Sequence, residues 1–440
     1  MAYRLLDETI REGEARGFHP HTPEERLTLL ALIQSVTGTK DFAIGFASMN
    51  PSAQRTLHAL LGAIEENELV PGTVGHVYFT YQSILPSRAL VDGLALRDRR
   101  RVAMAIGVAA STCIAGPTDG PWLMSQVGLP THSWRKMDER ELHERFASAA
   151  GAALRQFSNI GLSEVSFIVL DAFRAPERNV RIYLDAAVNA GASSVRLHDT
   201  VGIATPALVE ERITSLKRDF PSLALYTHFH DDFSLAVANT LAALECGAAG
   251  ADVTVNGIGN RAGNATTQSV LAALRVLRGE ALPEVRFDRL QELARETERY
   301  YGLIQSPFAP VTGSLVHVDE ASFRTHLVLA ENDRTFLPYS PSLVGASCEA
   351  VHTEGTSKRV VGNTLHRSAD VLDRAGVPID DAVVARAFSW VERTRDQRAA
   401  THRGAILATI ARYESELRHS YVSDADVVAE AVASGGLFDR

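Results

Sequence analysis

The chain has 440 residues, a formal net charge of −9 at pH 7 and a sequence pI near 5.9. Apolar residues make up 45% of it and charged residues 22%, the balance of an ordinary soluble globular protein. The acidic charge argues against a nucleic-acid surface, and the absence of any run of about 18 apolar residues argues against a membrane span. Cys113, Cys246 and Cys348 show no CxxC spacing, as is typical of thiols in a reducing compartment. We therefore expect a cytoplasmic protein.

Strand-like segments alternate with amphipathic, helix-like segments such as PEERLTLLALIQSV and SLAVANTLAALECG. This alternation is typical of a parallel sheet built from βαβ units, and eight repeats can close into a TIM (β/α)8 barrel of about 250 residues. An open doubly wound sheet is the alternative, but no GxGxxG motif follows the first strand. The predicted strands are residues 3–9, 41–46, 74–81, 101–108, 164–171, 194–199, 223–230 and 251–257.

The pattern changes near residue 282. Residues 306–345 are irregular and contain Pro, Phe and Ser, and mostly helical segments follow from about residue 365. We predict a TIM-barrel catalytic domain over residues 1–282 and a C-terminal linker or lid and helical region over residues 283–440. Such an appendage often folds over a barrel mouth or across a dimer partner, so a homodimer is expected.

Two histidines end the seventh predicted strand. His228 and His230 are separated by one residue in ALYTHFH. Side chains at positions i and i+2 of a strand share a face, so both imidazoles can bind one cation. The carboxyl ends of barrel strands are also where TIM-barrel active sites lie.

The first predicted strand ends in the charged segment DETIREGE, which holds Asp7, Arg11, Glu12 and Glu14. A carboxylate beside an arginine can supply a metal ligand and a cation for a developing oxyanion. A charged turn with solvated salt bridges is the alternative interpretation of this motif.

Two further motifs end neighbouring strands. The sixth predicted strand leads into HDTVGIATP, which places Thr200 at the rim of the barrel and Gly202 in the turn. The eighth leads into GIGNRAGN, whose glycines let the backbone approach a ligand closely and whose Asn264 offers a carbonyl oxygen. With the ends of strands one and seven, these motifs predict one catalytic rim.

The motifs resemble those of the metal-dependent acyl-CoA condensing enzymes, the homocitrate synthase and 2-isopropylmalate synthase family, relatives of the hydroxymethylglutaryl-CoA lyases. Family motifs of the form LREGEQ, EDxFR, DTVGxATP, HxHND and GIGERAGN match TIREGEA, LDAFR, DTVGIATP, HFHDD and GIGNRAGN. The segments PVTG, SPSLVG and VVGNTLHRSADVLDRAG resemble the family's post-barrel region. The resemblance therefore extends over nearly the whole chain.

The resemblance implies an acyltransferase that joins acetyl-CoA to a 2-oxo acid in a Claisen-type condensation. It implies a divalent metal ion (zinc, manganese or magnesium), which would polarise the ketone of the 2-oxo acid. Arg11 would neutralise the developing oxyanion, and Thr200 would bind the substrate carboxylate. The implied metal ligands are Glu12, His228, His230 and Asn264.

The fifth predicted strand departs from the family pattern. Homocitrate synthases carry an arginine, a serine and a glutamate there, whereas this chain has Ser166, Ile168 and Leu170 on one strand face. The clamp for a distal carboxylate is missing, so 2-oxoglutarate is not the expected substrate. Ser166 and Arg174 of the LDAFR motif are candidate substrate ligands.

The sixth predicted strand shows the opposite change, because Arg196 and His198 replace small residues ahead of DTVG. In one interpretation Arg196 binds the anionic end of a short 2-oxo acid, such as oxaloacetate or a phosphorus-bearing pyruvate, and His198 is the acid/base group. In the other, Ile168 and Leu170 line a pocket for a branched or aromatic 2-oxo acid, and Arg196 is paired inside the barrel. The added positive charge favours the first interpretation.

The C-terminal region supplies further candidate catalytic groups. His326, in ASFRTHL, lies two residues after the position that aligns with a family histidine, and Tyr339, in FLPYSP, lies near the position of a family tyrosine. We take His326 and Tyr339 as candidate catalytic residues. His317 and His352 are two further histidines that could reach the active site.

A lyase that runs a retro-aldol cleavage on the same barrel is the competing hypothesis, and a non-catalytic metal-binding homologue is a third. Lyases of this kind share a cysteine in the final glycine-rich loop. The corresponding loop of this chain, NGIGNRAGN, contains no cysteine. Retention of Arg11 together with the implied metal ligands argues against a non-catalytic protein. The expected partners are therefore small molecules, acetyl-CoA and a 2-oxo acid.

Overall fold

The computed structural model describes residues 3–14, 21–47, 51–66, 71–319, 337–420 and 422–433. The chain divides into two compact units. The first comprises residues 1–305 and 310–312, and the second comprises residues 306–309 and 313–440. No helix among the described residues combines the length and the apolar character that crossing a membrane requires.

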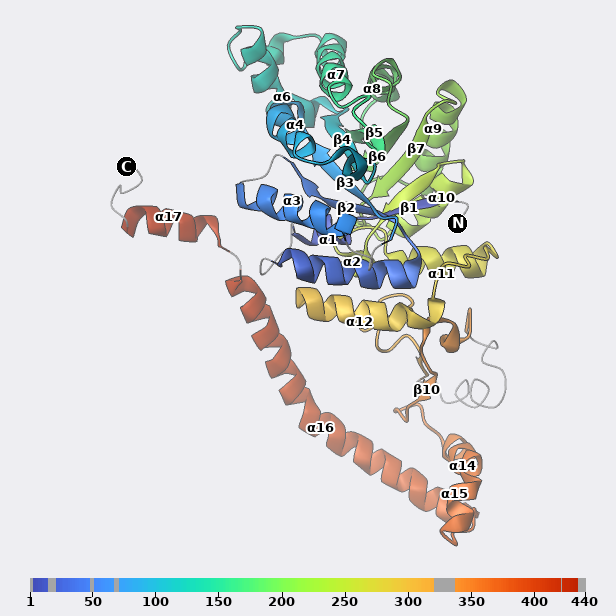
Figure 1. Cartoon of the computed structure of the whole chain (residues 1–440). Helices are drawn as coiled ribbons and strands as arrows, with labels where there is room; N and C mark the ends of the chain where they lie inside the picture. Colours follow the sequence, from blue (N-terminus) through green and yellow to red (C-terminus); the bar gives the residue numbers. More distant parts are fainter. Residues whose placement is uncertain are drawn as a thin grey trace. The chain divides into compact units, whose positions relative to one another are not determined.

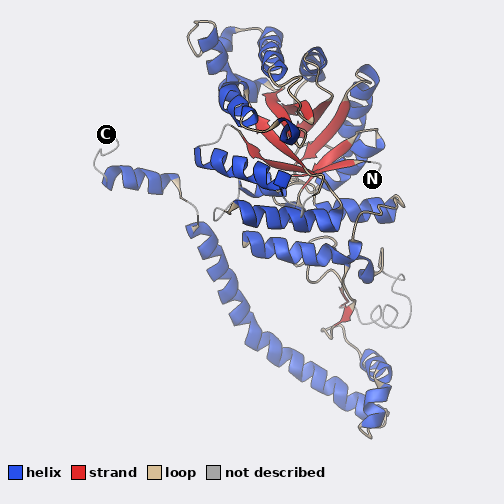
Figure 2. Cartoon of the chain, in the orientation of Figure 1, coloured by secondary structure: helices blue, strands red, loops and turns tan. Residues whose placement is uncertain are grey.

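The first unit is a closed barrel of parallel strands, with helices around the outside (Figure 1). Each strand predicted from the sequence overlaps one strand of the structure, so the TIM-barrel prediction is confirmed. Figure 2 shows the strands enclosed by the helices that connect them. The strands are β1 (Arg4–Asp7), β2 (Asp41–Phe46), β3 (Val74–Phe79), β4 (Val102–Ala109), β5 (Glu164–Leu170), β6 (Ser194–Asp199), β7 (Ala224–Phe229) and β8 (Gly250–Val253).

The helices of the first unit carry clear start and stop signals. Helix α2, for example, starts at a capping box formed by Thr22 and Glu25 and ends at Gly38, which adopts a left-handed conformation. The helices are α1 (Thr9–Glu14), α2 (Pro23–Thr37), α3 (Pro51–Glu66), α4 (Ile84–Asp92), α5 (Leu96–Arg99), α6 (Thr112–Gln126), α7 (Glu139–Arg155), α8 (Glu177–Asn189), α9 (Pro206–Asp219), α10 (Ala236–Glu245), α11 (Thr267–Leu277) and α12 (Leu290–Tyr301).

The inside of the barrel is layered. At the amino-terminal end, Arg4 pairs with Asp41 and lies 2.5 Å from Glu164, and His76 Nε2 lies 3.0 Å from Asp41 Oδ1. Above this charged layer lies an apolar cluster of Leu6, Ala43, Tyr78, Ala105 and Ile168. The barrel is thus filled by side chains, which leaves the carboxyl ends of the strands as the place for a site.

The second unit is mainly helical, as the sequence predicts for the region after residue 365. Its two short strands, β9 (Val318–Asp319) and β10 (Glu349–Ala350), pair in parallel. Its longest helix, α16, is capped by Asp380, whose side chain accepts a hydrogen bond from the backbone N–H of Val383. The helices are α14 (Lys358–Arg367), α15 (Ala369–Arg374), α16 (Asp381–His419) and α17 (Asp424–Ala433).

Barrel closure predicts a sensitive glycine. At the start of β8, a Cβ on Gly250 would lie 1.8 Å from the carbonyl oxygen of Arg4, so Gly250→Ala must push β8 away from β1. We expect it to lower the free energy of unfolding by roughly 1–3 kcal/mol or more, measured by urea denaturation. The matched control is Gly62→Ala within α3, where a Cβ meets nothing within 4 Å. It should raise stability by roughly 0.5–1 kcal/mol. Equal effects of both substitutions would contradict this account of closure.

Candidate active site

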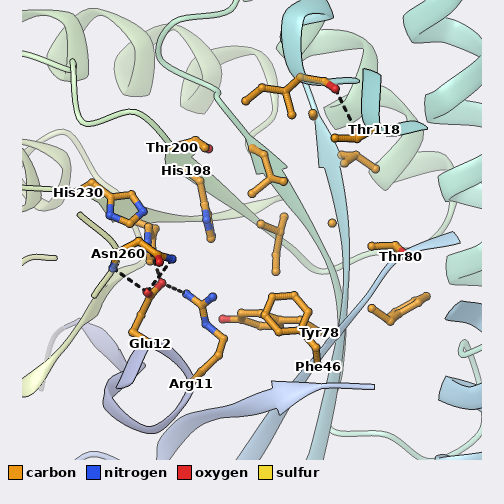
Figure 3. A pocket seen from close by; sticks show the side chains of 18 of the residues that line it. Arg11, Glu12, Phe46, Tyr78, Thr80, Thr118, His198, Thr200, His230 and Asn260 are labelled. Carbon is orange, nitrogen blue, oxygen red and sulfur yellow. Dashed lines mark hydrogen bonds and ion pairs between the residues drawn. The ribbon is translucent and has the colours of Figure 1, made fainter. Parts of the chain in front are cut away.

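A cavity of about 370 Å³ opens at the carboxyl ends of the barrel strands. Figure 3 shows Glu12, Arg11 and His230 on one side of it, with Thr80 and Thr118 on the other. The polar lining comprises Arg11, Glu12, Thr80, Thr118, Asp119, His198, Thr200, His228, His230, Asn260 and Arg261. The apolar and aromatic lining comprises Phe46, Tyr78, Phe79, Val108, Ala109, Ile114, Ile168 and Leu170.

Three buried side chains form a candidate metal site at one end of this cavity. Glu12, His228 and His230 each present a donor atom, and these atoms lie within 4.8 Å of one another. Strand β7 and its continuation carry both histidines, and Glu12 comes from α1, directly after β1. Asn264 joins them, because its Nδ2 lies 2.8 Å from His228 Nε2. The four residues that the family resemblance implies as metal ligands are therefore neighbours in space.

The donor set fits a divalent cation. Burial lowers the pKa of His230 to about 3, so its imidazole is neutral and can act as a ligand. The Oδ1 atom of Asn264 is buried and has no hydrogen-bond partner among the described residues. Two imidazoles, a carboxylate and an amide oxygen suit zinc or manganese. Magnesium would need more oxygen ligands, which water could supply.

A pair of buried carboxylates lies behind His228. Its Nδ1 atom is 3.3 Å from Glu8 Oε2 and 3.4 Å from Asp252 Oδ2. Burial lowers the pKa of His228, but the two carboxylates outweigh burial and raise this pKa to about 10. Neither Glu8 nor Asp252 is among the candidate residues that the sequence motifs indicate. The available signal was strand alternation, because Glu8 continues the inward face of Leu6 and Asp252 lies two residues after Gly250.

Arg11 lies between the candidate metal site and the aromatic wall of the cavity. Its Nε donates to Glu8 Oε2 at 3.0 Å, and its Nη2 pairs with Glu8 and Glu12. Its guanidinium carbon lies 5.1 Å from the ring centroid of Tyr78 and 5.6 Å from that of Phe46. Carboxylates and rings thus hold a permanent positive charge at the cavity wall.

Arg196 does not reach the cavity, contrary to the favoured interpretation of the sequence. Its side chain is 0% exposed and pairs with Asp252 across the barrel interior, and its guanidinium carbon lies 4.7 Å from the ring centroid of Tyr226. Transfer of an unpaired guanidinium into a barrel would be costly, and the carboxylate offsets that cost. The geometry matches the other interpretation, in which Arg196 is paired internally while Ile168 and Leu170 line the cavity.

His198 and Thr200 do line the cavity, as the strand alternation predicts. The rings of His198 and His228 stack with centroids 4.2 Å apart and planes 8° from parallel. Burial and the neighbouring His228 lower the pKa of His198 well below its usual value, so its imidazole is neutral. The hydroxyl of Thr200 accepts a hydrogen bond of 2.7 Å from the backbone N–H of Asp171.

The other candidates in the first unit lie away from the cavity lining. Ser166 is buried on β5, and Arg174 pairs with Asp171 at 2.5 Å. Neither residue lines the cavity as the structure describes it. Of the charged residues in DETIREGE, Asp7 accepts hydrogen bonds from the backbone and hydroxyl of Thr9. Glu14 pairs with Arg26.

The structure describes the surroundings of three of the four candidate residues in the second unit. Tyr339 and His317 form an edge contact with ring centroids 5.9 Å apart. His352 lines a shallow hollow with Trp390 and Val391. His326 lies outside the described residues. The catalytic roles of Tyr339 and His326 stay predictions.

Comparisons with known proteins identify related sequences. The HMGL-like family matches residues 130–296. A homocitrate synthase from Sulfolobus acidocaldarius is 26% identical over 393 residues, which cover 89% of this chain and 75% of that protein. A probable 2-isopropylmalate synthase from Methanopyrus kandleri is 39% identical over 181 residues, which cover 41% of this chain and 36% of that protein.

A solved structure supports the fold alone. The hydroxymethylglutaryl-CoA lyase from Pseudomonas aeruginosa superposes with a TM-score of 0.52 at 19% sequence identity. The match covers 68% of this chain and 93% of the lyase. The barrel architecture is therefore shared with that protein.

The candidate metal site predicts a specific loss of metal. His230→Ala should weaken binding of one divalent cation by roughly 100-fold or more, because a buried ligand is removed and no neighbour replaces it. Competition with a chromophoric chelator, followed by metal analysis, measures this change. The control is His143→Ala, a buried histidine outside the site that hydrogen-bonds Tyr183 at 2.8 Å. Unchanged affinity in His230→Ala would refute the assignment.

Proposed function

Because the chain carries an HMGL-like domain and is a homologue of the homocitrate and 2-isopropylmalate synthases, we propose that it is an acyltransferase that condenses acetyl-CoA with a 2-oxo acid. The observation that carries the proposal is the cavity itself. It holds the candidate metal donors and Arg11 at one end, and apolar side chains such as Ile168, Leu170 and Ile114 line it elsewhere. A 2-oxo acid has the same two-ended chemistry, with a chelating head and a variable side chain.

The polar end supplies the groups that such a condensation needs. Glu12, His228, His230 and Asn264 would hold a divalent cation, and such a cation would polarise the ketone as a Lewis acid. Arg11 carries a fixed positive charge at the same end, where negative charge develops on the ketone oxygen as the acetyl-CoA carbon adds. Thr200, at the cavity rim, can donate its hydroxyl proton to the substrate carboxylate.

A proton must leave the methyl group of acetyl-CoA before its carbon can attack. His198 is a neutral imidazole whose side chain lines the cavity. A neutral imidazole can accept a proton. We therefore assign the acid/base role to His198. Hydrolysis of the thioester then releases CoA and makes the condensation irreversible.

The position of Arg196 changes which side chain we expect on the 2-oxo acid substrate. A short anionic 2-oxo acid requires a cation at the far wall, but Arg196 is sealed beneath it and paired. The wall instead presents Ile168, Leu170 and Ile114. Burial of an apolar side chain contributes roughly 0.8 kcal/mol per CH₂ group. We therefore propose a branched or aromatic 2-oxo acid as the substrate.

The proposal predicts which substrates release CoA. With a divalent metal, the protein should release free thiol from acetyl-CoA only when a suitable 2-oxo acid is present. In a thiol-release screen, 2-oxoisovalerate or phenylpyruvate should exceed oxaloacetate and 2-oxoglutarate in kcat/KM by at least 10-fold. A preference for oxaloacetate would instead support a short anionic 2-oxo acid as the substrate. Cleavage of a 3-hydroxyacyl-CoA without any condensation would establish the competing lyase activity.

A single substitution tests the apolar wall. Leu170→Arg places a cation beside the cavity. The value of kcat/KM for the best apolar substrate should therefore fall by roughly 10-fold or more. The value of kcat/KM for oxaloacetate, divided by that for the apolar substrate, should rise. The matched control is Leu129→Arg, at a leucine that is exposed and distant from the lining. It should leave both values unchanged. An unaltered preference in Leu170→Arg would show that Leu170 does not contact the substrate side chain.

A further inference from the structure

The cavity of the first unit carries a second set of polar side chains, which the proposed condensation does not use. Thr80, Thr118 and Asp119 line the cavity, and we call these three residues the distal polar group. Thr80 directly follows β3, whereas Thr118 and Asp119 belong to α6, which follows β4. Figure 3 shows Thr80 and Thr118 across the cavity from Glu12 and His230.

The strand order of the barrel explains this separation. In a closed ring that runs from β1 to β8, β3 stands opposite β7 and β4 stands opposite β8. Strand β7 leads to the candidate metal ligands His228 and His230. The distal polar group follows the two strands on the other side of the ring. A molecule that spans the cavity therefore meets polar side chains at both ends, and apolar side chains such as Ile168 and Leu170 elsewhere.

The distal polar group presents hydrogen-bond acceptors. The hydroxyl of Thr118 donates its only proton to the carbonyl oxygen of Ile114 at 2.8 Å, so the Thr118 oxygen is left to accept. The carboxylate of Asp119 is also an acceptor. Burial raises the pKa of Asp119, and the nearby hydroxyl of Tyr81 opposes that rise. An N–H or O–H group of a ligand would stabilise the carboxylate in the same way.

Packing around α6 gives this helix a defined position. The ring of Tyr81 stacks on that of Trp122, with centroids 4.7 Å apart and planes 22° from parallel. A Cβ on Gly120 would lie 2.5 Å from the ring of Trp134, so the glycine makes room for that indole. These contacts bracket Asp119 along the helix and keep its carboxyl at the cavity.

The charge of Asp119 also determines which side chains the cavity disfavours. A second carboxylate beside Asp119 would be repelled, and the repulsion is stronger in a partly buried site than in water. A 2-oxo acid with an anionic side chain is therefore disfavoured at this end. This argument is independent of the pairing of Arg196.

We propose that the distal polar group selects a 2-oxo acid whose side chain is apolar along its length and ends in a hydrogen-bond donor, as in 4-hydroxyphenylpyruvate. The inference rests on the proposed function for the 2-oxo acid head, which would lie at the metal donors. Asp119 is the specificity-determining residue, and the oxygen of Thr118 is a second acceptor. A hydrogen bond to an ionised group corresponds to roughly 10-fold or more in affinity.

Equilibrium binding tests the proposal without acetyl-CoA. Titration calorimetry of the full chain with Zn²⁺ present compares 4-hydroxyphenylpyruvate with phenylpyruvate, which differ only in the hydroxyl group. The hydroxylated acid should bind roughly 10-fold more tightly or better. Asp119→Ala should bring the two dissociation constants to within about 3-fold of each other. Thr118→Val should lower the ratio by a smaller factor. The control Asp185→Ala, at an exposed aspartate of α8, should leave the ratio unchanged.

Three results would overturn the proposal. The first is equal affinity of the unsubstituted protein for the two acids, and the second is an unchanged ratio in a folded Asp119→Ala protein. The third is an unchanged ratio with weaker binding of acetyl-CoA by Asp119→Ala, which would assign the distal polar group to the coenzyme. Circular dichroism establishes folding. If Asp119→Ala fails to fold, the ratios of the unsubstituted protein and of Thr118→Val decide the question.

The thiol-release screen separates this inference from the proposed function. Absence of CoA release with every 2-oxo acid would refute the acyltransferase. The ratio of the two dissociation constants involves no turnover, so it tests the distal polar group by itself.

Discussion

The ion pair between Arg196 and Asp252 is the interaction on which the chemistry of this barrel depends. Both side chains lie inside the barrel, where a charge without a partner would be strongly destabilising. The pair keeps Arg196 out of the cavity lining, in which Ile168 and Leu170 are apolar members. It also fixes Asp252 beside His228. One buried contact therefore affects both the polarity of the cavity and the charge behind a candidate metal ligand.

His228 is the point at which the two halves of the site meet. Asn264 and Glu12 lie on the Nε2 side of its ring, and Glu8 and Asp252 lie on the Nδ1 side. Carboxylates behind a metal-ligating histidine orient the ring and raise its basicity.

The sequence predicted the parts of the molecule that depend on local pattern. Alternation of strand-like and helix-like segments identified the barrel, and parallel strands end at one edge, so the motifs of Glu12, His228 and Asn264 had to converge. The partner of Arg196 could not be predicted in this way. It depends on which residues of β6 and β8 lie at the same height across the barrel, over a separation of 56 residues. The same reason hid Glu8 and Asp252, whose burial against His228 is a property of barrel packing.

Closure of the barrel has a consequence for how the protein is made. Strand β1 pairs with β8, and residues Arg4 and Gly250 are register partners although 250 − 4 = 246 residues separate them. At a synthesis rate of about 5–20 residues per second, β8 is made about 12 to 50 s after β1. During that time one edge of β1 stays unpaired, and neither His228 nor His230 can yet face Glu12. The nascent chain therefore passes through an aggregation-prone interval that ends only when the last strand emerges.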